Sequence, residues 1–441
     1  DILIIIDNPL REHLNLNLLK KIFTHKGLSS RIVSKHLFEY AIYKYKPQSV
    51  IVPRVTGGFS KIFDLSKKIK FHIYLLPCEH GAGEKARIIS FLTGAENRNN
   101  YDLSNFRNYK NILKFFVPSE PYKKICIDSG LFSEDQIIIT GTISSDFWFE
   151  KISETIDNKK NQISIGIASS FKSTFFGINF ISFLEGLLFL KNVSDGKKFE
   201  ESIEKNIYFQ SFESLSFLNL LKIIDDNPDI KFSWRLHPQE NLKGAQHLVK
   251  KIKNLEINRD LIPYNWIKNQ SLILLNSSTM IYDSFFLKTP TVSLINLIPN
   301  SIKNNLEDIK KPLKSSQILN PESIDEVLEL IKNKNFNDFI KTNSKEMLDE
   351  SLKNFNFPRK NFAVIVIAVE ISKKIKKVKN NFVTGKLSNF FADIMVNLKT
   401  IRTAYSPKYK NIQLDKVLNP LNFKDKLKIN HFINKIIKKI I

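Results

Sequence analysis

The sequence predicts an α/β fold in which two doubly wound parallel sheets are followed by C-terminal helices and a basic tail. Short apolar runs alternate with helical patterns of about 10–15 residues, which is typical of parallel sheets covered by helices on both faces. The chain has 441 residues. At about 100–200 residues per domain, that length accommodates two such domains.

The first 150 residues contain the first series of expected strands. Leu14, Leu18 and Ile22 share one face of a helix that ends near Gly27, and similar patterns fill the other gaps. We assign residues 1–150 to a Rossmann-like N-terminal domain. Its expected strands are Ile2–Ile6, Arg31–Val33, Ser49–Val52, His72–Leu76, Leu113–Val117 and Gln136–Thr140.

The pattern then starts again after a polar linker at Ile152–Gln162. We assign residues 160–370 to a second Rossmann-like domain, which includes closing helices at Ser323–Lys332 and Lys345–Phe355 and the start of a basic helix at Asn361–Lys379. The expected strands of this domain are Ile163–Ala168, Ile230–Arg235, Ser271–Leu275 and Thr291–Leu294.

Positive charge is concentrated at the C-terminal end. The net charge of the chain is +23, and residues 373–441 hold 16 Lys, one Arg and three Asp, a net charge of +14. Lys pairs alternate there with Ile, Phe and Leu, which favours a basic amphipathic helix on an anionic membrane surface. The alternatives are a helix packed on its own domain and a segment that docks a partner.

Two cysteines, Cys78 and Cys126, are too few for a disulfide framework, and no Cys/His cluster suggests zinc. No apolar run reaches the length of a membrane span, and the opening DILIIID has no secretory signal pattern. We therefore expect a cytoplasmic protein, peripheral at the inner face of the cytoplasmic membrane through its tail. Charge alone favours nucleic-acid binding, and without an RRM, KH or zinc signature we expect no nucleic-acid partner.

An Arg-x-His-Pro turn follows one strand of the second domain. Ligands of open α/β sheets bind beyond the carboxyl ends of the strands, so this position favours a ligand-binding role for the turn. Arg235 and His237 would offer a phosphate a permanent cation and an imidazole donor, and Pro238 fixes the turn. The structural alternative is that Arg235 pairs with Glu240 while His237 bonds a loop carbonyl.

Three consecutive hydroxyl residues, Ser277, Ser278 and Thr279, stand between a buried strand and a helix. Ser277 or Ser278 would cap the helix, and hydroxyls beside free N–H groups would bind an anion. Capping alone explains only one serine. Asp283, within the helix, is a candidate substrate-binding residue.

A third motif, Glu79-His80-Gly81-Ala82-Gly83, follows the fourth strand of the first domain. The glycines permit close approach of the backbone, so Gly81 and Gly83 are candidate substrate-binding residues. Glu79 or His80 could act as a general base toward a bound hydroxyl. The alternative is a plain glycine turn in which Glu84 caps the next helix.

Together, the two domains, the Arg-x-His-Pro turn and the Ser-Ser-Thr helix start resemble glycosyltransferases of the GT-B architecture. The closer likeness is to capsule and lipopolysaccharide enzymes that use CMP-activated sugars, the Kdo and sialic acid transferases. This resemblance implies that His237, Pro238, Ser277 and Ser278 hold the nucleotide and its phosphate. It also implies that Glu79 or His80 acts on the acceptor.

CDP-glycerol and related polyol-phosphate transferases show a second likeness. They share the Arg-x-His-Pro turn, a Ser-Ser before a helix containing Asp, and a His-Gly in the first domain, which Asp283 and His80-Gly81 would match. A sugar-nucleotide epimerase on the same two-domain fold is a third alternative. Cytidine nucleotides are common to the first two.

These likenesses lead to a hypothesis of metal-independent transfer of an ulosonic acid from a CMP-sugar to a surface glycan or lipid-linked acceptor, in the cleft between the domains. Glu79 or His80 would take the acceptor proton while Arg235 and the hydroxyl residues stabilise the departing phosphate. No Asp-x-Asp, the metal-binding pair of many other sugar transferases, occurs in the chain. We expect no metal and no cofactor besides the donor.

Overall fold

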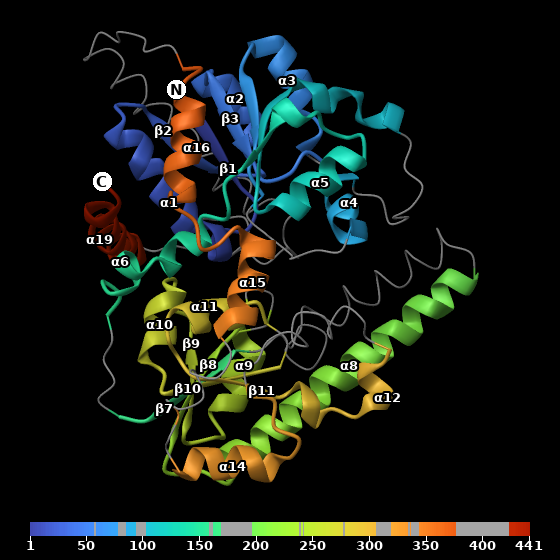
Figure 1. The fold of residues 1–441 in the computed structure, drawn as a ribbon, viewed down its shortest axis with the longest axis vertical. Helices are drawn as coiled ribbons and strands as arrows, with labels where there is room; N and C mark the ends of the chain where they lie inside the picture. The colour runs from blue at the N-terminus through green and yellow to red at the C-terminus, as the bar shows by residue number, and fades with distance from the viewer. Residues whose placement is uncertain are drawn as a thin grey trace. The chain divides into compact units, whose positions relative to one another are not determined.

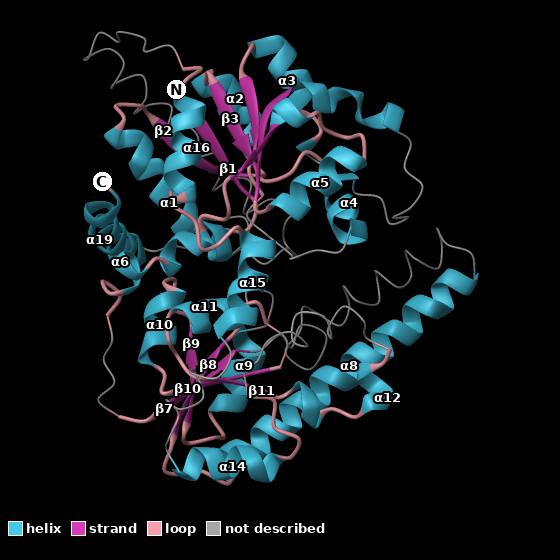
Figure 2. Cartoon of the chain, in the orientation of Figure 1, coloured by secondary structure: helices cyan, strands magenta, loops and turns pink. Residues whose placement is uncertain are grey.

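The computed structural model divides the chain into two compact units, Asp1–Ile152 with Ser351–Ile441 (unit 1) and Ser153–Glu350 (unit 2). Each unit contains one sheet, and every strand pair in both sheets is parallel (Figure 1, Figure 2). The structure describes residues 1–56, 59–77, 85–93, 103–157, 162–168, 196–237, 240, 242–276, 278–305, 319–333, 336, 344–375 and 423–441.

Unit 1 is built on a six-stranded sheet with the order β2-β1-β3-β4-β5-β6. Ile2 of β1 pairs with Ser30 of β2 on one side and Ser49 of β3 on the other, so β1 lies inside the sheet. The strands are β1 (Ile2–Ile6), β2 (Ser30–Ser34), β3 (Ser49–Val52), β4 (His72–Leu75), β5 (Ile112–Val117) and β6 (Ile137–Ile139).

Helices cover both faces of this sheet. Leu3 and Ile5 of β1 belong to a core with Phe38 and Ile62, whereas Ile2, Ile4 and Ile6 are buried on the opposite face, which contacts α1. The helices of unit 1 are α1 (Pro9–His25), α2 (Phe38–Tyr45), α3 (Ile62–Ile69), α4 (Lys85–Thr93), α5 (Glu120–Asp128), α6 (Glu150–Ser153), α16 (Ala363–Ser372) and α19 (Phe423–Ile440), with 3₁₀ turns η2 (Leu103–Asn111), η3 (Glu134–Gln136) and η4 (Ser144–Trp148).

Unit 2 is built on a five-stranded sheet with the order β11-β10-β7-β8-β9. Its strands are β7 (Ser164–Ala168), β8 (Lys231–Arg235), β9 (Leu255–Asn258), β10 (Leu272–Leu275) and β11 (Thr291–Ser293). Its helices are α8 (Gly196–Asp225), α9 (Leu242–Val249), α10 (Pro263–Asn269), α11 (Met280–Phe286), α12 (Asn300–Lys303) and α14 (Ile324–Asn333), with 3₁₀ turn η5 (Ile295–Leu297); α15 (Ser344–Phe355) crosses the boundary between the units.

The fold class is as predicted, but the division of the chain differs from the expected domains. Residues 351–370, assigned to the second domain from sequence, are counted in unit 1, where α16 packs on α1 and η4. The second sheet also gains a strand, β9, which the sequence analysis did not expect. The physical reason for the first difference is a buried carboxylate.

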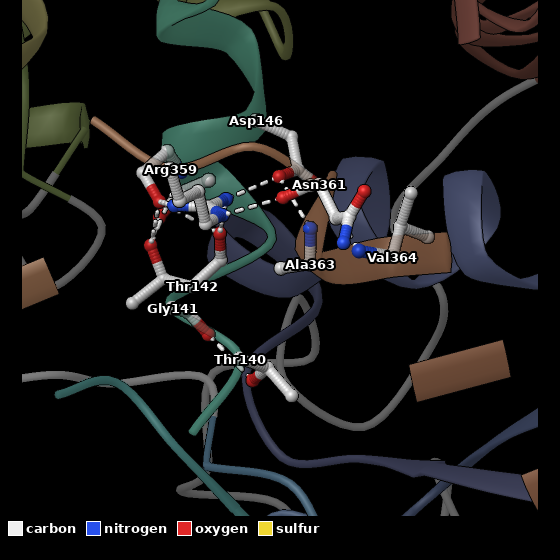
Figure 3. Close-up of polar contacts among 10 residues, drawn as sticks. Thr140, Gly141, Thr142, Asp146, Arg359, Asn361, Ala363 and Val364 are labelled. Carbon is white, nitrogen blue, oxygen red and sulfur yellow. Dashed lines mark hydrogen bonds and ion pairs between the residues drawn. The ribbon is translucent and has the colours of Figure 1, made fainter. Parts of the chain in front are cut away.

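Asp146 in η4 anchors the returning chain to unit 1 (Figure 3). Its oxygens accept the first N–H groups of α16, those of Ala363 at 2.8 Å and Val364 at 2.9 Å, and it forms an ion pair with Arg359. Asp146 is fully buried and the Arg359 side chain is 8% exposed. Gly141 has positive φ and no Cβ, and a Cβ at this position would lie 2.5 Å from the Arg359 guanidinium.

Replacing Asp146 with Asn should destabilise the protein strongly, because the buried Arg359 cation would lose its counterion. Removing one partner of a buried pair costs about 3–5 kcal/mol. Urea denaturation measures this loss. Glu134→Gln, which breaks the exposed pair with Lys123, is the matched control and should leave the midpoint nearly unchanged. Equal effects of the two variants would contradict the anchoring role.

The basic tail ends in an amphipathic helix whose apolar face is covered. Ile429, Phe432, Ile433, Ile436 and Ile437 of α19 are buried, α19 packs on α1, and Phe432 stacks on the ring of Phe147 at 5.9 Å. Of the alternatives for the tail, the structure shows packing on its own domain for 423–440. Among the described helices, none is long and apolar enough to span a membrane.

His13 lies on α1 near this helix and is 8% exposed. Its Nδ1 makes no hydrogen bond within the described residues. Burial, with smaller contributions from Lys426 and Lys20, lowers the pKa of His13 from 6.5 to about 4. Folding therefore requires the neutral imidazole, and stability is lost as the pH falls from above 6.5 towards 4.

The pH dependence of unfolding tests this buried histidine. The shift corresponds to about 3 kcal/mol lost on acidification, and His13→Gln should remove that part of the slope. Urea midpoints at pH 7.5, 6, 5 and 4 give the profile. His72→Gln, at an exposed position on β4, should keep the wild-type slope. An unchanged slope in His13→Gln would show that another group controls the acid sensitivity.

Candidate functional site at the carboxyl edge of unit 2

The carboxyl ends of the unit 2 strands form one row. The register pairs Leu275 with Ala168, Ala168 with Arg235, and Arg235 with Asn258. β7, the first strand of unit 2, lies between β10 on one side and β8 on the other, so the order of strands reverses between β7 and β10. Ligands of doubly wound sheets bind at such a switch point, beyond the carboxyl ends.

Arg235 ends β8 and is held from two sides. Its Nη1 donates to Asn258 Oδ1 at 3.1 Å, and its guanidinium lies 5.8 Å from the centre of the Trp266 ring. Burial lowers the pKa of Arg235 to about 10, and the carboxylates of Asp260 and Asp283 act in the opposite direction. A group with this pKa is fully charged at neutral pH, so Arg235 is a fixed cation at the edge of the sheet.

Trp266 reaches its place under Arg235 because the neighbouring strand carries a glycine. A Cβ on Gly166 would lie 2.9 Å from the indole ring. The indole Nε1 donates to Ser233 Oγ at 3.0 Å, and Ser233 is the register partner of Gly166. The ring is therefore fixed against the sheet, and Arg235 has a rigid support.

The Arg-x-His-Pro turn is held by Glu240, which is 1% exposed. Glu240 Oε2 accepts the backbone N–H of His237 at 2.8 Å, and the N–H of Glu240 donates to His237 O at 2.9 Å. Arg235 bonds Asn258, and not Glu240, which the structural alternative had expected as its partner. His237 is half-buried, and Pro238 lies outside the described residues.

Of the three hydroxyl residues after β10, the structure describes Ser278 and Thr279. Helix α11 begins at Met280 with Thr279 as N-cap, and Thr279 makes no capping bond through its side chain. Ser278 Oγ accepts the N–H of Met280 at 3.2 Å. Thr279 is exposed at the surface. Ser277 lies outside the described residues. Asp283 of α11 is brought within electrostatic range of Arg235.

The motif of the first domain cannot be placed in the same way. Glu79, His80, Gly81 and Gly83 lie outside the described residues. Strand β4, which precedes them, ends in Leu75, paired with Val52 of β3 at the carboxyl edge of the unit 1 sheet. The assignment of either Glu79 or His80 as the base stays a prediction.

Two supporting residues, Asn258 and Trp266, were missed by sequence reasoning. A signal was available in Leu255-Glu256-Ile257-Asn258, where apolar and polar residues alternate between a helix and the Pro263 helix start. Within the described ranges, no group of three or more His, Cys, Asp or Glu side chains could hold a metal ion. The expectation of a metal-independent reaction is untested.

No family model and no curated protein sequence matches the chain. Among solved structures, a variant of the wall teichoic acid polymerase TagF matches with a TM-score of 0.53 and 11% identity, over 84% of this chain and 88% of that chain. Another TagF structure gives 0.50 and 13% over the same shares. A UDP-GlcNAc 2-epimerase from Neisseria meningitidis bound to UDP-GlcNAc gives 0.43 and 12%, over 84% and 99%.

The similarity to TagF concerns the fold. It agrees with two parallel-sheet α/β domains of the Rossmann type. This is the fold class predicted from sequence.

Proposed function

We propose that this chain is a transferase that moves a group from a cytidine-nucleotide donor to an acceptor, with the donor phosphate bound at Arg235. The observation that carries the proposal is the position of this cation. Arg235 ends a strand next to the switch point of the sheet, and Asn258 and Trp266 hold its guanidinium in place. A fixed guanidinium is suited to a phosphate because it offers several N–H donors in one plane.

Transfer breaks the bond between the nucleotide phosphate and the transferred group, and negative charge grows on the departing phosphate. Arg235 offsets this charge without moving, which is where fixed electrostatic groups contribute most to catalysis. The Ser278 and Thr279 hydroxyls follow β10 at the same edge and supply further hydrogen bonds. His237 adds an imidazole donor on the turn that Glu240 holds.

The donor predicted from the sequence resemblance is a CMP-linked ulosonic acid such as Kdo or sialic acid, transferred to a surface glycan or glycolipid. A CDP-glycerol or polyol-phosphate donor is the second candidate. It is favoured by the TM-score of 0.53 with TagF, a wall teichoic acid polymerase, and by Asp283 near Arg235. CMP is the nucleotide released in both reactions, so it is the ligand to test first.

Calorimetric titration of CMP into the purified chain and its variants tests the nucleotide site. Arg235→Gln should weaken CMP binding by about tenfold to a hundredfold, because a charge-assisted hydrogen bond contributes about 1.5–3 kcal/mol. Lys231→Gln is the matched control, since Lys231 starts the same strand and pairs with Glu256. It should bind CMP like the wild type.

Equal CMP affinity in the wild type and Arg235→Gln would contradict the proposal, as would binding of UMP in preference to CMP. Release of CMP from each donor then separates the two reactions. CMP-Kdo or CMP-sialic acid as substrate supports sugar transfer, and CDP-glycerol supports polyol-phosphate transfer.

A further inference from the structure

The sheet of unit 1 has a switch point of its own, between β1 and β3. From β1 the chain passes to β2 on one side of β1 and returns to β3 on the other. Three charged residues stand just beyond the carboxyl ends of these strands: Asp7 after β1, Lys35 after β2 and Arg54 after β3. The topology therefore brings together residues far apart in the sequence at the place where this kind of sheet binds ligands.

Asp7 holds both cations, one with each carboxylate oxygen. Lys35 Nζ donates to Oδ1 at 2.5 Å, and Arg54 Nη2 donates to Oδ2. The Arg54 guanidinium also lies 5.6 Å from the centre of the Phe59 ring. Both long side chains are thus directed to one carboxylate. Holding them there costs side-chain entropy, which a single exposed ion pair rarely offsets.

The charges in this cluster are layered. Side-chain exposure is 17% for Asp7, 31% for Lys35 and 39% for Arg54. Behind them, Glu12 is 2% exposed, and its oxygens accept the N–H groups of Asp7 at 2.9 Å and Asn8 at 3.1 Å. The carboxylates lie inside with their oxygens engaged, and the two cations lie outside.

Lys35 and Arg54 keep donors for a ligand. The ammonium group has three N–H donors and the guanidinium has five, and the contacts with Asp7 use one from each side chain. Both cations are more exposed than either carboxylate, so their remaining N–H groups are the more accessible part of the cluster to an oxyanion from solvent. Asp7, Lys35 and Arg54 together carry one positive charge, and the buried Glu12 carboxylate lies next to them in the chain's first helical turn.

We propose that Lys35 and Arg54 form an oxyanion-binding site for a phosphate or carboxylate group of the second substrate, with Asp7 as the residue that positions them. Description of the ligand as the acceptor rests on the proposed transferase function. The site itself does not, because it is built from unit 1 residues alone. It gives the acceptor a chemical class, an anionic molecule.

Calorimetry of the full chain with three probes, inorganic phosphate, sn-glycerol 3-phosphate and acetate, tests the site. All titrations use the Arg235→Gln background, which lacks the phosphate-binding cation proposed for unit 2. Adding Arg54→Gln or Lys35→Met should weaken probe binding about tenfold each, as expected for the loss of one charge-assisted bond. Arg54→Lys keeps a cation and should retain most of the affinity.

Lys61→Met is the matched control, because Lys61 is an exposed lysine of the same unit that pairs with Glu39. It should leave probe binding unchanged. Binding of the two phosphates but not acetate assigns the group to phosphate, and the reverse assigns it to carboxylate. No binding of any probe, or equal binding with and without Arg54→Gln, overturns the proposal.

The failure of the two proposals can be told apart with CMP as a fourth titrant, in the otherwise wild-type chain. Arg54→Gln alone should bind CMP normally. If no variant and no wild-type protein binds CMP while the probes still require Arg54, the transferase proposal fails and the oxyanion site stands. If CMP binding requires Arg235 but probe binding does not depend on Arg54, the oxyanion site fails and the transferase proposal stands.

Discussion

Every strand in the two described sheets runs parallel to its neighbours, and the rest of the structure depends on this constraint. Parallel strands need crossover connections, which cover both faces with helices and bury the sheet. They also end at the same edge, so residues such as Arg235 and Asn258, or Asp7 and Arg54, come together from distant segments. The candidate binding residues of each unit are therefore gathered at one edge of its sheet.

At both edges, neighbouring side chains hold a partly buried cation in place. Asn258 and the Trp266 ring fix Arg235, and Gly166 gives that ring its place. In unit 1, Asp7 does the same for Lys35 and Arg54. A cation held this way meets an anion with little further ordering, which is the physical advantage of a preorganised site.

The return of the chain to unit 1 rests on a different interaction. Asp146 occupies the N-terminal end of α16 and pairs with Arg359, so one carboxylate satisfies two helical N–H groups and a buried cation. The anchored segment packs on α1, as does α19. The apolar side of the basic tail helix is consequently used inside the protein, and Lys426, Lys428, Lys438 and Lys439 are exposed to solvent.

Much of the fold could be predicted from the sequence because buried parallel strands are apolar throughout. Runs such as Ile2–Ile6 and Leu272–Leu275 can be recognised as buried strands without knowledge of the strands they pair with. Strand β9 was missed because Leu255–Asn258 is a short edge strand with a single buried residue. The place of α16 was missed because the sequence of an apolar helix does not show which sheet the helix packs against. The Asp146–Arg359 pair, which anchors this segment, joins residues 213 positions apart and has no local sequence pattern.

The sequence predicted which residues form part of the candidate site, but it did not predict which side chains they contact. Arg235 stands at a strand end as expected, yet its partner Asn258 lies on the strand that the sequence analysis did not find. The layered cluster around Asp7 has no local sequence signature, since its members follow three separate strands. The roles of Glu79, His80 and Ser277 stay predictions.

A crystal structure of the chain with bound CMP tests the central claim most directly. We expect a nucleotide at the carboxyl edge of unit 2, with its phosphate about 3 Å from the Arg235 guanidinium. A nucleotide bound elsewhere on the chain, with no contact to Arg235, would contradict the proposed phosphate site.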